Sequence, residues 1–170
     1  MTELEDFRQE KDAYFRRDPY SPIPAGERAD FPGLRYFPEE PALRLTVPLE
    51  RAEAPEEVEM QTSTGDVATY NTLGRVNFEV DGQPVTLTIY ESEEGDLFLP
   101  FRDATSGHET YGAGRYLEPH RHDNDHLLLD FNLAYNPYCA YSPEWSCPVP
   151  PRENWLVAPI RAGELVYHEE

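Results

Sequence analysis

Proline limits what this chain can fold into more than any other residue. Seventeen prolines and ten glycines are spread over 170 residues. Proline fixes φ and lacks a backbone N–H, so this number favours rigid turns over long helices. Residues 1–18, which precede Pro19, are the best helix candidate, because Thr2 and Glu5 match a capping box. One face of that helix would carry Leu4, Phe7, Lys11 and Tyr14.

Beyond the helix, residues 19–42 are rich in proline and are expected to form an ordered loop. A period of two begins at Leu43 and predicts strands, with Asp81-Gly82 as a tight turn between two of them. We expect strands at 43–47, 58–60, 76–80, 85–89, 96–101, 111–117, 125–131 and 155–160. The expected fold is mainly β, an antiparallel meander closing into a barrel or sandwich, with one N-terminal α-helix. We expect a single domain, 1–170, whose β body spans 43–167.

The charge of the chain is strongly negative. Asp and Glu number 33 against 14 Lys and Arg, a net charge of −19, and Lys11 is the single lysine. Such a surface repels phosphate backbones, so neither nucleic acid nor an anionic membrane is an expected partner. The pattern fits either a high-GC genome or a salt-loving host. With neither an apolar run of membrane length nor an apolar segment behind Met1, we expect a cytoplasmic protein.

The segment 98–151 has the composition of a functional site, since it holds both cysteines and four of the five histidines. Asp103 and Thr105 follow a predicted strand. They are either turn formers or side chains that project into a pocket, with Asp103 as a candidate acid or base. The histidine-rich loop 119–126 suggests a metal, but its composition is that of a solvated turn. We expect no metal site here, and the sequence identifies no cofactor.

Arg115 follows two glycines, Gly112 and Gly114, which usually mark a bulge or a close backbone approach. Arg115 either caps the sheet through an ion pair or holds a carboxylate or phosphate of a ligand. Asp130 ends an apolar run and needs a partner if it is buried, and Arg115 is the expected one. Further candidate ligand contacts are Tyr111, Asn132, Asn136 and Asn154.

Cys139 and Cys147 are eight positions apart, outside the usual spacing of a zinc knuckle. In a cytosol the default is two reduced thiols. Either cysteine could act as a nucleophile, for which His108 is the nearest candidate base, or both could be buried beside aromatic residues.

The motifs DATSG, TYGAGRYL, LLLDFNLAYNPYCAYS and CPVPPRENWL carry a resemblance. The chain resembles an uncharacterised bacterial and archaeal family called domain of unknown function 1684, over nearly its whole length. Leu133 stands where the family has a basic residue, and the histidines of 119–126 do not match the family pattern. The resemblance implies no established activity. The positions that match are Asp103, Gly107, Tyr111, Gly112, Gly114, Arg115, Tyr116, Asp130, Asn132, Asn136, Cys139, Cys147, Pro150 and Asn154.

Three functional hypotheses remain open. The first is a β-rich binding module whose polar pocket takes a small, anionic ligand through Arg115. The second is an enzyme, a hydrolase or transferase, with Cys139 or Cys147 as nucleophile or with Asp103 or Asp130 as general base. The third is a polar network that only fixes the loops.

Overall fold

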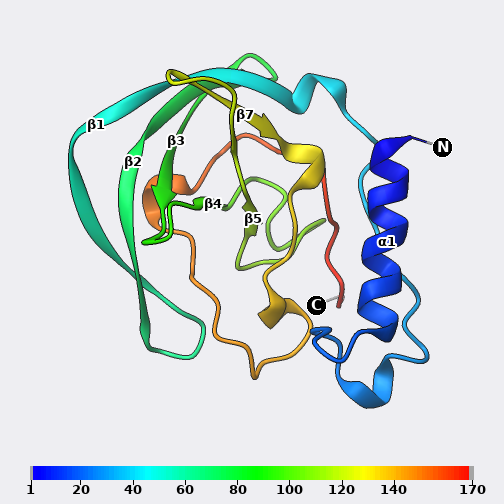
Figure 1. Cartoon of the computed structure of the whole chain (residues 1–170). Coiled ribbons are helices and arrows are strands. Elements are labelled where there is room, and N and C mark those ends of the chain that lie inside the picture. Colours follow the sequence, from blue (N-terminus) through cyan, green and yellow to red (C-terminus); the bar gives the residue numbers. More distant parts are fainter. Residues whose placement is uncertain (1, 169–170) are drawn as a thin grey trace.

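One N-terminal helix stands beside a curled β-sheet (Figure 1). The computed structural model describes residues 2–168, so Met1 of the expected helix and residues 169–170 of the expected domain lie outside it. Helix α1 (Glu3–Arg17) begins with the predicted capping box, in which Thr2 and Glu5 exchange hydrogen bonds. The helix prediction is therefore confirmed. The helix ends at Arg17, and its C-cap, Asp18, directly precedes Pro19.

The strands form one antiparallel sheet of seven, in the order β5-β4-β3-β2-β1-β7-β6. The predicted turn at Asp81-Gly82 joins β2 to β3, and both residues have positive φ. The strands are β1 (Arg44–Gln61), β2 (Val67–Val80), β3 (Gln83–Glu91), β4 (Leu97–Phe101), β5 (Arg115–Leu117), β6 (His120–Arg121) and β7 (His126–Asp130). Short 3-10 turns cover Ala25–Glu27, Pro41–Leu43, Phe131–Leu133, Tyr138–Ala140 and Arg152–Asn154.

The sheet is an open half-barrel, so the prediction of a closed barrel or a sandwich is wrong. Strand β2 shifts its register once against β1 and once against β3, near Gly74, and such irregularities bend a sheet. A Cβ at Gly74 would lie directly against the backbone of Glu50, so only glycine permits this approach. The edge strands β5 and β6 do not pair with each other, so the barrel stays open. Strand β5 instead forms an isolated bridge between Tyr116 and Tyr135.

Irregular chain, rather than further strands, fills the concave side of the sheet. Ala158 and Ile160 are buried in the same core as Leu87, Leu99 and Phe101. The strand expected at 155–160 is wrong. The alternation of buried positions is present, but the N–H of Ile160 bonds to the Asp103 carboxylate instead of a strand partner.

The strand expected at 111–117 is shorter than predicted and covers Arg115–Leu117 only. Residues 111–114 form a turn in which Gly114 has φ +110°. A Cβ there would lie 2.5 Å from the carbonyl oxygen of Phe101, so the predicted close backbone approach is confirmed at this glycine.

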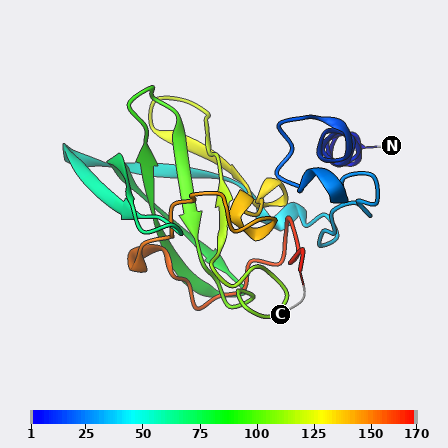
Figure 2. The ribbon, with the colours of Figure 1, turned by 90° about the horizontal axis from the view of Figure 1, so that it is seen from below.

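A second cluster attaches α1 to the sheet. Phe15 of the helix packs with Phe31 of the proline-rich loop and with Tyr141. Lys11 forms an ion pair with the buried Glu164. Figure 2 shows α1 end-on at one side of the sheet, with irregular chain between them.

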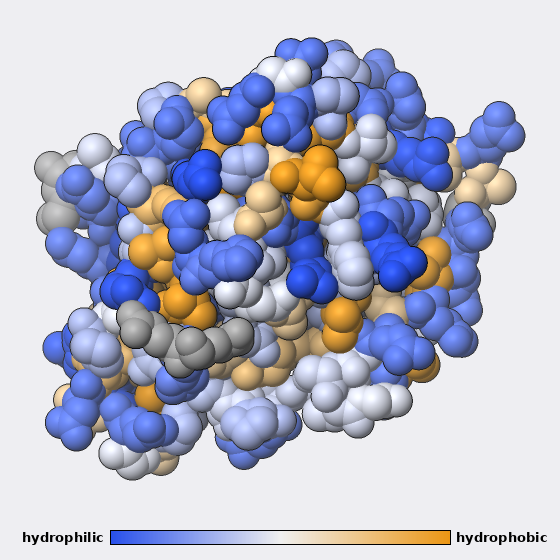
Figure 3. All heavy atoms as spheres, turned by 180° about the vertical axis from the view of Figure 1, so that it is seen from behind, coloured by the Kyte–Doolittle hydropathy of each residue, from blue (hydrophilic) through white to orange (hydrophobic). Residues whose placement is uncertain are grey.

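The face opposite to that of Figure 1 is mostly hydrophilic, with scattered apolar side chains (Figure 3). Within residues 2–168, no helix is both long enough and apolar enough to span a bilayer.

Candidate functional site

Arg115 is fully buried, with an exposed fraction of 0 %. Its guanidinium donates hydrogen bonds to the carbonyl oxygens of Ala162, Ile160 (2.8 Å) and Glu164 (3.3 Å). Burial lowers its pKa, and the Asp103 carboxylate at 3.5 Å opposes this shift. Arg115 thus fastens the C-terminal segment 160–164 to strand β5.

Asp103 is the second centre of this network. Its Oδ2 accepts hydrogen bonds from the backbone N–H of Ile160 (2.7 Å) and from the hydroxyl of Thr105 (2.8 Å). The Thr105 hydroxyl lies 2.9 Å from that of Thr110. The geometry favours the turn-forming interpretation of Asp103 and Thr105, because their polar atoms face the protein.

The expected pairing of Arg115 with Asp130 is wrong. Asp130 lies at the end of β7, opposite Arg44 of β1, and the carboxylate bonds to the Arg44 guanidinium at 3.1 Å. Four strands, β4 to β1, separate β5 from β7 in the sheet. An apolar run followed by an acid indicates burial, but it does not identify the strand on which the partner lies.

Asn132, Asn136 and Asn154 each hold a distant backbone segment through hydrogen bonds of the side-chain amide, and we call each such contact a clamp. The Asn132 amide accepts from the N–H of Glu40 (2.8 Å) and donates to its carbonyl (3.0 Å). Asn154 does the same with Thr88, at 2.8 and 2.9 Å, and also donates to Pro100. Asn136 donates to the carbonyl of Leu165 at 3.0 Å. Each amide replaces strand hydrogen bonds that irregular chain cannot supply.

The predicted ligand contacts therefore fall into several separate places. Asp103, Thr105 and Arg115 share one buried network, while Asp130 and Asn132 are hydrogen-bonded at the end of β7. The remaining predicted contacts are Tyr111, which meets Cys139, and Asn136 and Asn154 at their own clamps. Their role in binding a ligand stays a prediction.

The two cysteines are brought together. Both are free thiols, the backbone N–H of Cys139 lies 3.2 Å from the Cys147 sulfur, and the Tyr111 hydroxyl lies 3.6 Å from the Cys139 sulfur. The neighbouring Cys147 thiol and the Tyr111 hydroxyl lower the pKa of Cys139 to about 6, against the effect of burial. The same contact and burial raise the pKa of Cys147.

His108 does not sit where the nucleophile hypothesis expected it. It is exposed and lines a separate surface hollow with Tyr36 and Phe37. In the histidine-rich loop, His126 contacts Asp123 at 2.9 Å. Within residues 2–168, no three His, Cys, Asp or Glu side chains converge as a metal site requires.

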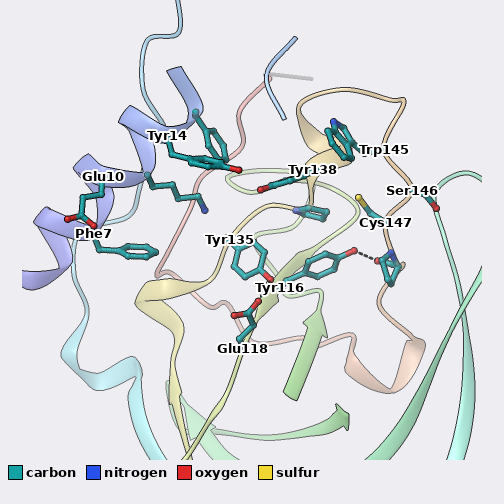
Figure 4. Close-up of a pocket in the computed structure, with 14 residues that line it drawn as sticks. Phe7, Glu10, Tyr14, Tyr116, Glu118, Tyr135, Tyr138, Trp145, Ser146 and Cys147 are labelled. Carbon is teal, nitrogen blue, oxygen red and sulfur yellow. Dashed lines mark hydrogen bonds between the residues drawn. The ribbon is translucent and has the colours of Figure 1, made fainter. Parts of the chain in front are cut away.

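A cavity of about 640 Å³ lies between α1 and the edge of the sheet, and we call it the aromatic pocket. Phe7 and Tyr14 point from α1 toward Tyr135 and Tyr138 (Figure 4). Its lining is Phe7, Glu10, Lys11, Tyr14, Phe15, Tyr116, Glu118, Tyr135, Pro137, Tyr138, Trp145, Ser146, Cys147 and Pro148. The sequence carried a partial signal, because Phe7, Lys11 and Tyr14 share one predicted helix face. In the structure Phe7 and Tyr14 remain exposed.

The lining of the aromatic pocket carries more negative than positive charge. Lys11, whose ammonium lies 5.1 Å from the Tyr135 ring, is paired with Glu164, which also accepts from the Tyr141 hydroxyl (3.1 Å). Glu10 and Glu118 line the same pocket, and Glu118 accepts from the Tyr135 hydroxyl at 3.0 Å. Burial raises the pKa of Tyr135, so its phenol stays neutral. The two glutamates therefore leave the pocket negative.

Comparison with known proteins agrees with this architecture. The family profile described as "Protein of unknown function (DUF1684)" matches residues 29–165. The chain belongs to this family. A solution NMR structure of an uncharacterised protein from gene locus rrnAC0354 of Haloarcula marismortui is 41% identical and has a TM-score of 0.74. The match covers 98% of this chain and 94% of that one.

The resemblance expected from the sequence is confirmed by these matches. A search of curated proteins finds no match. For this DUF1684 chain, the matches show a family and a fold.

Proposed function

We propose that this protein binds a small aromatic molecule that carries a positive charge, and that the aromatic pocket is its site. The observation that carries the proposal is the lining, in which seven of fourteen residues are aromatic and two are glutamates that form no ion pair within residues 2–168. A volume of about 640 Å³ is in the range of small-molecule sites.

Ring faces account for the preference for a cation. Aromatic rings present negative faces, so they attract a cation that lies over them. Lys11 already occupies such a position over Tyr135, and the buried Glu164 compensates its charge. A ligand therefore meets the rings and the two remaining carboxylates, Glu10 and Glu118, in a protein of net charge −19.

This proposal differs from the anionic ligand expected from Arg115. The Arg115 guanidinium is directed at carbonyl oxygens and at Asp103, and it has no exposed surface. Its Nε has no hydrogen-bond partner among the described residues, but that atom is buried as well, so Arg115 is out of reach of an external anion. The charge on the accessible wall, at Glu10 and Glu118, then decides the sign of the ligand.

A cytoplasmic location is part of the same proposal. Cys139 and Cys147 lie in contact as free thiols, an arrangement that a reducing compartment would preserve. Detection of the native protein in the cytosolic fraction of its host cells checks this; recovery outside the cytoplasm contradicts it.

Tryptophan fluorescence tests the binding proposal. The chain has two tryptophans, and Trp155 lies outside the pocket, so Trp155→Phe leaves Trp145 as the reporter. Titration with phenyltrimethylammonium is expected to change this signal to saturation, while phenylacetate, its anionic counterpart, changes it little. A response to phenylacetate as strong as that to the cation contradicts the proposed charge preference.

Two variants of helix α1 test whether a pocket carboxylate contributes to binding of the cation. Glu10→Gln removes a pocket carboxylate and is expected to weaken binding of the cation by about fivefold. Glu3→Gln, an exposed change on the same helix outside the pocket, is the control and is expected to leave the affinity unchanged. Equal affinities of the two variants would place the ligand elsewhere.

A further inference from the structure

Cys139 and Cys147 are held together by more than their own contact. The backbone N–H and carbonyl of Cys147 bond to the hydroxyl and the N–H of Ser63, at 3.1 and 2.9 Å. Cys139 sits in the turn Tyr138–Ala140, and its N–H bonds to the Cys147 sulfur. The two sulfurs are thus brought together from segments whose backbone is fixed.

The two thiols differ in surroundings. Cys139 is partly exposed and has the Tyr111 hydroxyl beside its sulfur, a donor that stabilises a thiolate. Cys147 is buried and is one of the residues that line the aromatic pocket. The lowered pKa of Cys139 and the raised pKa of Cys147 agree with this asymmetry.

We infer that Cys139 and Cys147 form a redox-active dithiol that reduces small disulfides, with Cys139 as the attacking and Cys147 as the resolving thiol. This activity is separate from the proposed ligand binding and does not depend on it. The substrate class is a low-molecular-weight disulfide, R–S–S–R, that reaches the exposed side of Cys139.

The exchange balances in two steps. The Cys139 thiolate attacks one sulfur of R–S–S–R, so a mixed disulfide forms and one R–S⁻ leaves. Cys147 then loses its proton to water and attacks the Cys139 sulfur, which forms the Cys139–Cys147 disulfide and releases the second R–S⁻. Two protein thiols are oxidised, and one disulfide is reduced to two thiolates.

Dithiodipyridine, a neutral aromatic disulfide that the acidic protein does not repel, is the reagent for the test. The reduced wild-type protein is expected to release two equivalents of thiopyridone, and its intact mass is expected to fall by two hydrogens without an adduct. Wild-type protein that instead retains an adduct on each cysteine overturns the inference. This readout needs no variant and therefore no assumption about variant folding.

Single variants assign the two roles. Cys147→Ser is expected to release one equivalent and to retain one adduct, while Cys139→Ser is expected to react about tenfold more slowly than Cys147→Ser. Equal rates for the two variants, with thermal melts showing both folded, overturn the assignment.

Tyr111→Phe tests the activation of Cys139. Loss of the hydroxyl donor is expected to raise the midpoint of the pH–rate profile, since the thiolate then forms at higher pH. The wild-type rate is expected to rise through pH 6, as the lowered pKa of Cys139 requires. A midpoint in the range of an ordinary free thiol for both proteins contradicts the inference.

Discussion

The guanidinium of Arg115 and the carboxylate of Asp103 lie 3.5 Å apart, and neither side chain has more than a trace of exposed surface. Around this pair, hydrogen bonds reach the backbone at Ile160, Ala162 and Glu164. The pair thereby holds irregular chain against the half-barrel. Loss of the Arg115–Asp103 pair is therefore expected to lower the stability of the fold.

Arg115→Leu is expected to lower the free energy of unfolding by about 3–5 kcal/mol, because it leaves Asp103 buried without its counter-charge. Arg44→Leu is the matched control, since Arg44 pairs with Asp130 near the surface. The control is expected to cost less than about 1 kcal/mol. Urea denaturation measures both, and equal losses would contradict the structural role given to Arg115.

The clamp formed by Asn154 gives a second prediction. Asn154→Ala removes three hydrogen bonds to the backbone of Thr88 and Pro100 and is expected to cost about 3 kcal/mol. Asn124→Ala, at an exposed turn, is expected to change stability by less than about 0.5 kcal/mol. Thermal melts of the two variants decide the matter; an Asn154→Ala protein as stable as the control would rule out the clamp.

Gly114 and Gly107 differ in how closely other parts of the chain approach them. Both have positive φ, but a Cβ at Gly114 meets the Phe101 carbonyl oxygen at 2.5 Å, whereas Gly107 faces open space. Gly107→Ala is expected to cost about 1 kcal/mol from backbone conformation alone. Gly114→Ala is expected to cost roughly 3 kcal/mol or more, because its neighbours are also displaced. Similar denaturation midpoints for the two variants would contradict this difference.

Salt is expected to stabilise the fold. The net charge of −19 produces self-repulsion that ions screen, and the similar protein of known structure comes from Haloarcula marismortui. The melting temperature is expected to rise by several degrees between dilute buffer and molar potassium chloride. Sucrose at equal osmolarity is the control. It is excluded from the protein surface but does not screen charge, so a rise in melting temperature with salt alone reports charge screening. A melting temperature that does not change with salt would show that this repulsion is not destabilising.

Local features of the fold could be predicted from the sequence. The capping box at Thr2 and the turn at Asp81-Gly82 depend on neighbouring residues, and both are confirmed. The curl of the sheet depends on Gly74 passing the backbone of Glu50, a contact between strands that no local pattern records. For this reason the open half-barrel was predicted as a closed barrel or a sandwich.

The site was less predictable, because polar residues with the composition of a site can serve irregular backbone instead. Arg115 and Asn154 bond to backbone groups far away in the sequence, and only the fold shows those partners. The aromatic pocket combines Phe7 of α1 with Trp145 of a distant loop. In the sequence, a predicted helix face that carries Phe7 and Tyr14 gave a partial signal of this pocket.

The most direct test of the account is to map the ligand by NMR on the labelled, full-length protein. During titration with phenyltrimethylammonium, the amides near Phe7, Tyr138 and Trp145 are expected to shift to saturation. Those around Asp103 and Arg115 are expected to stay in place, and phenylacetate is expected to produce no saturating shifts. Shifts centred on Asp103 and Arg115, or none with the cation, would contradict the proposal that the aromatic pocket is the binding site.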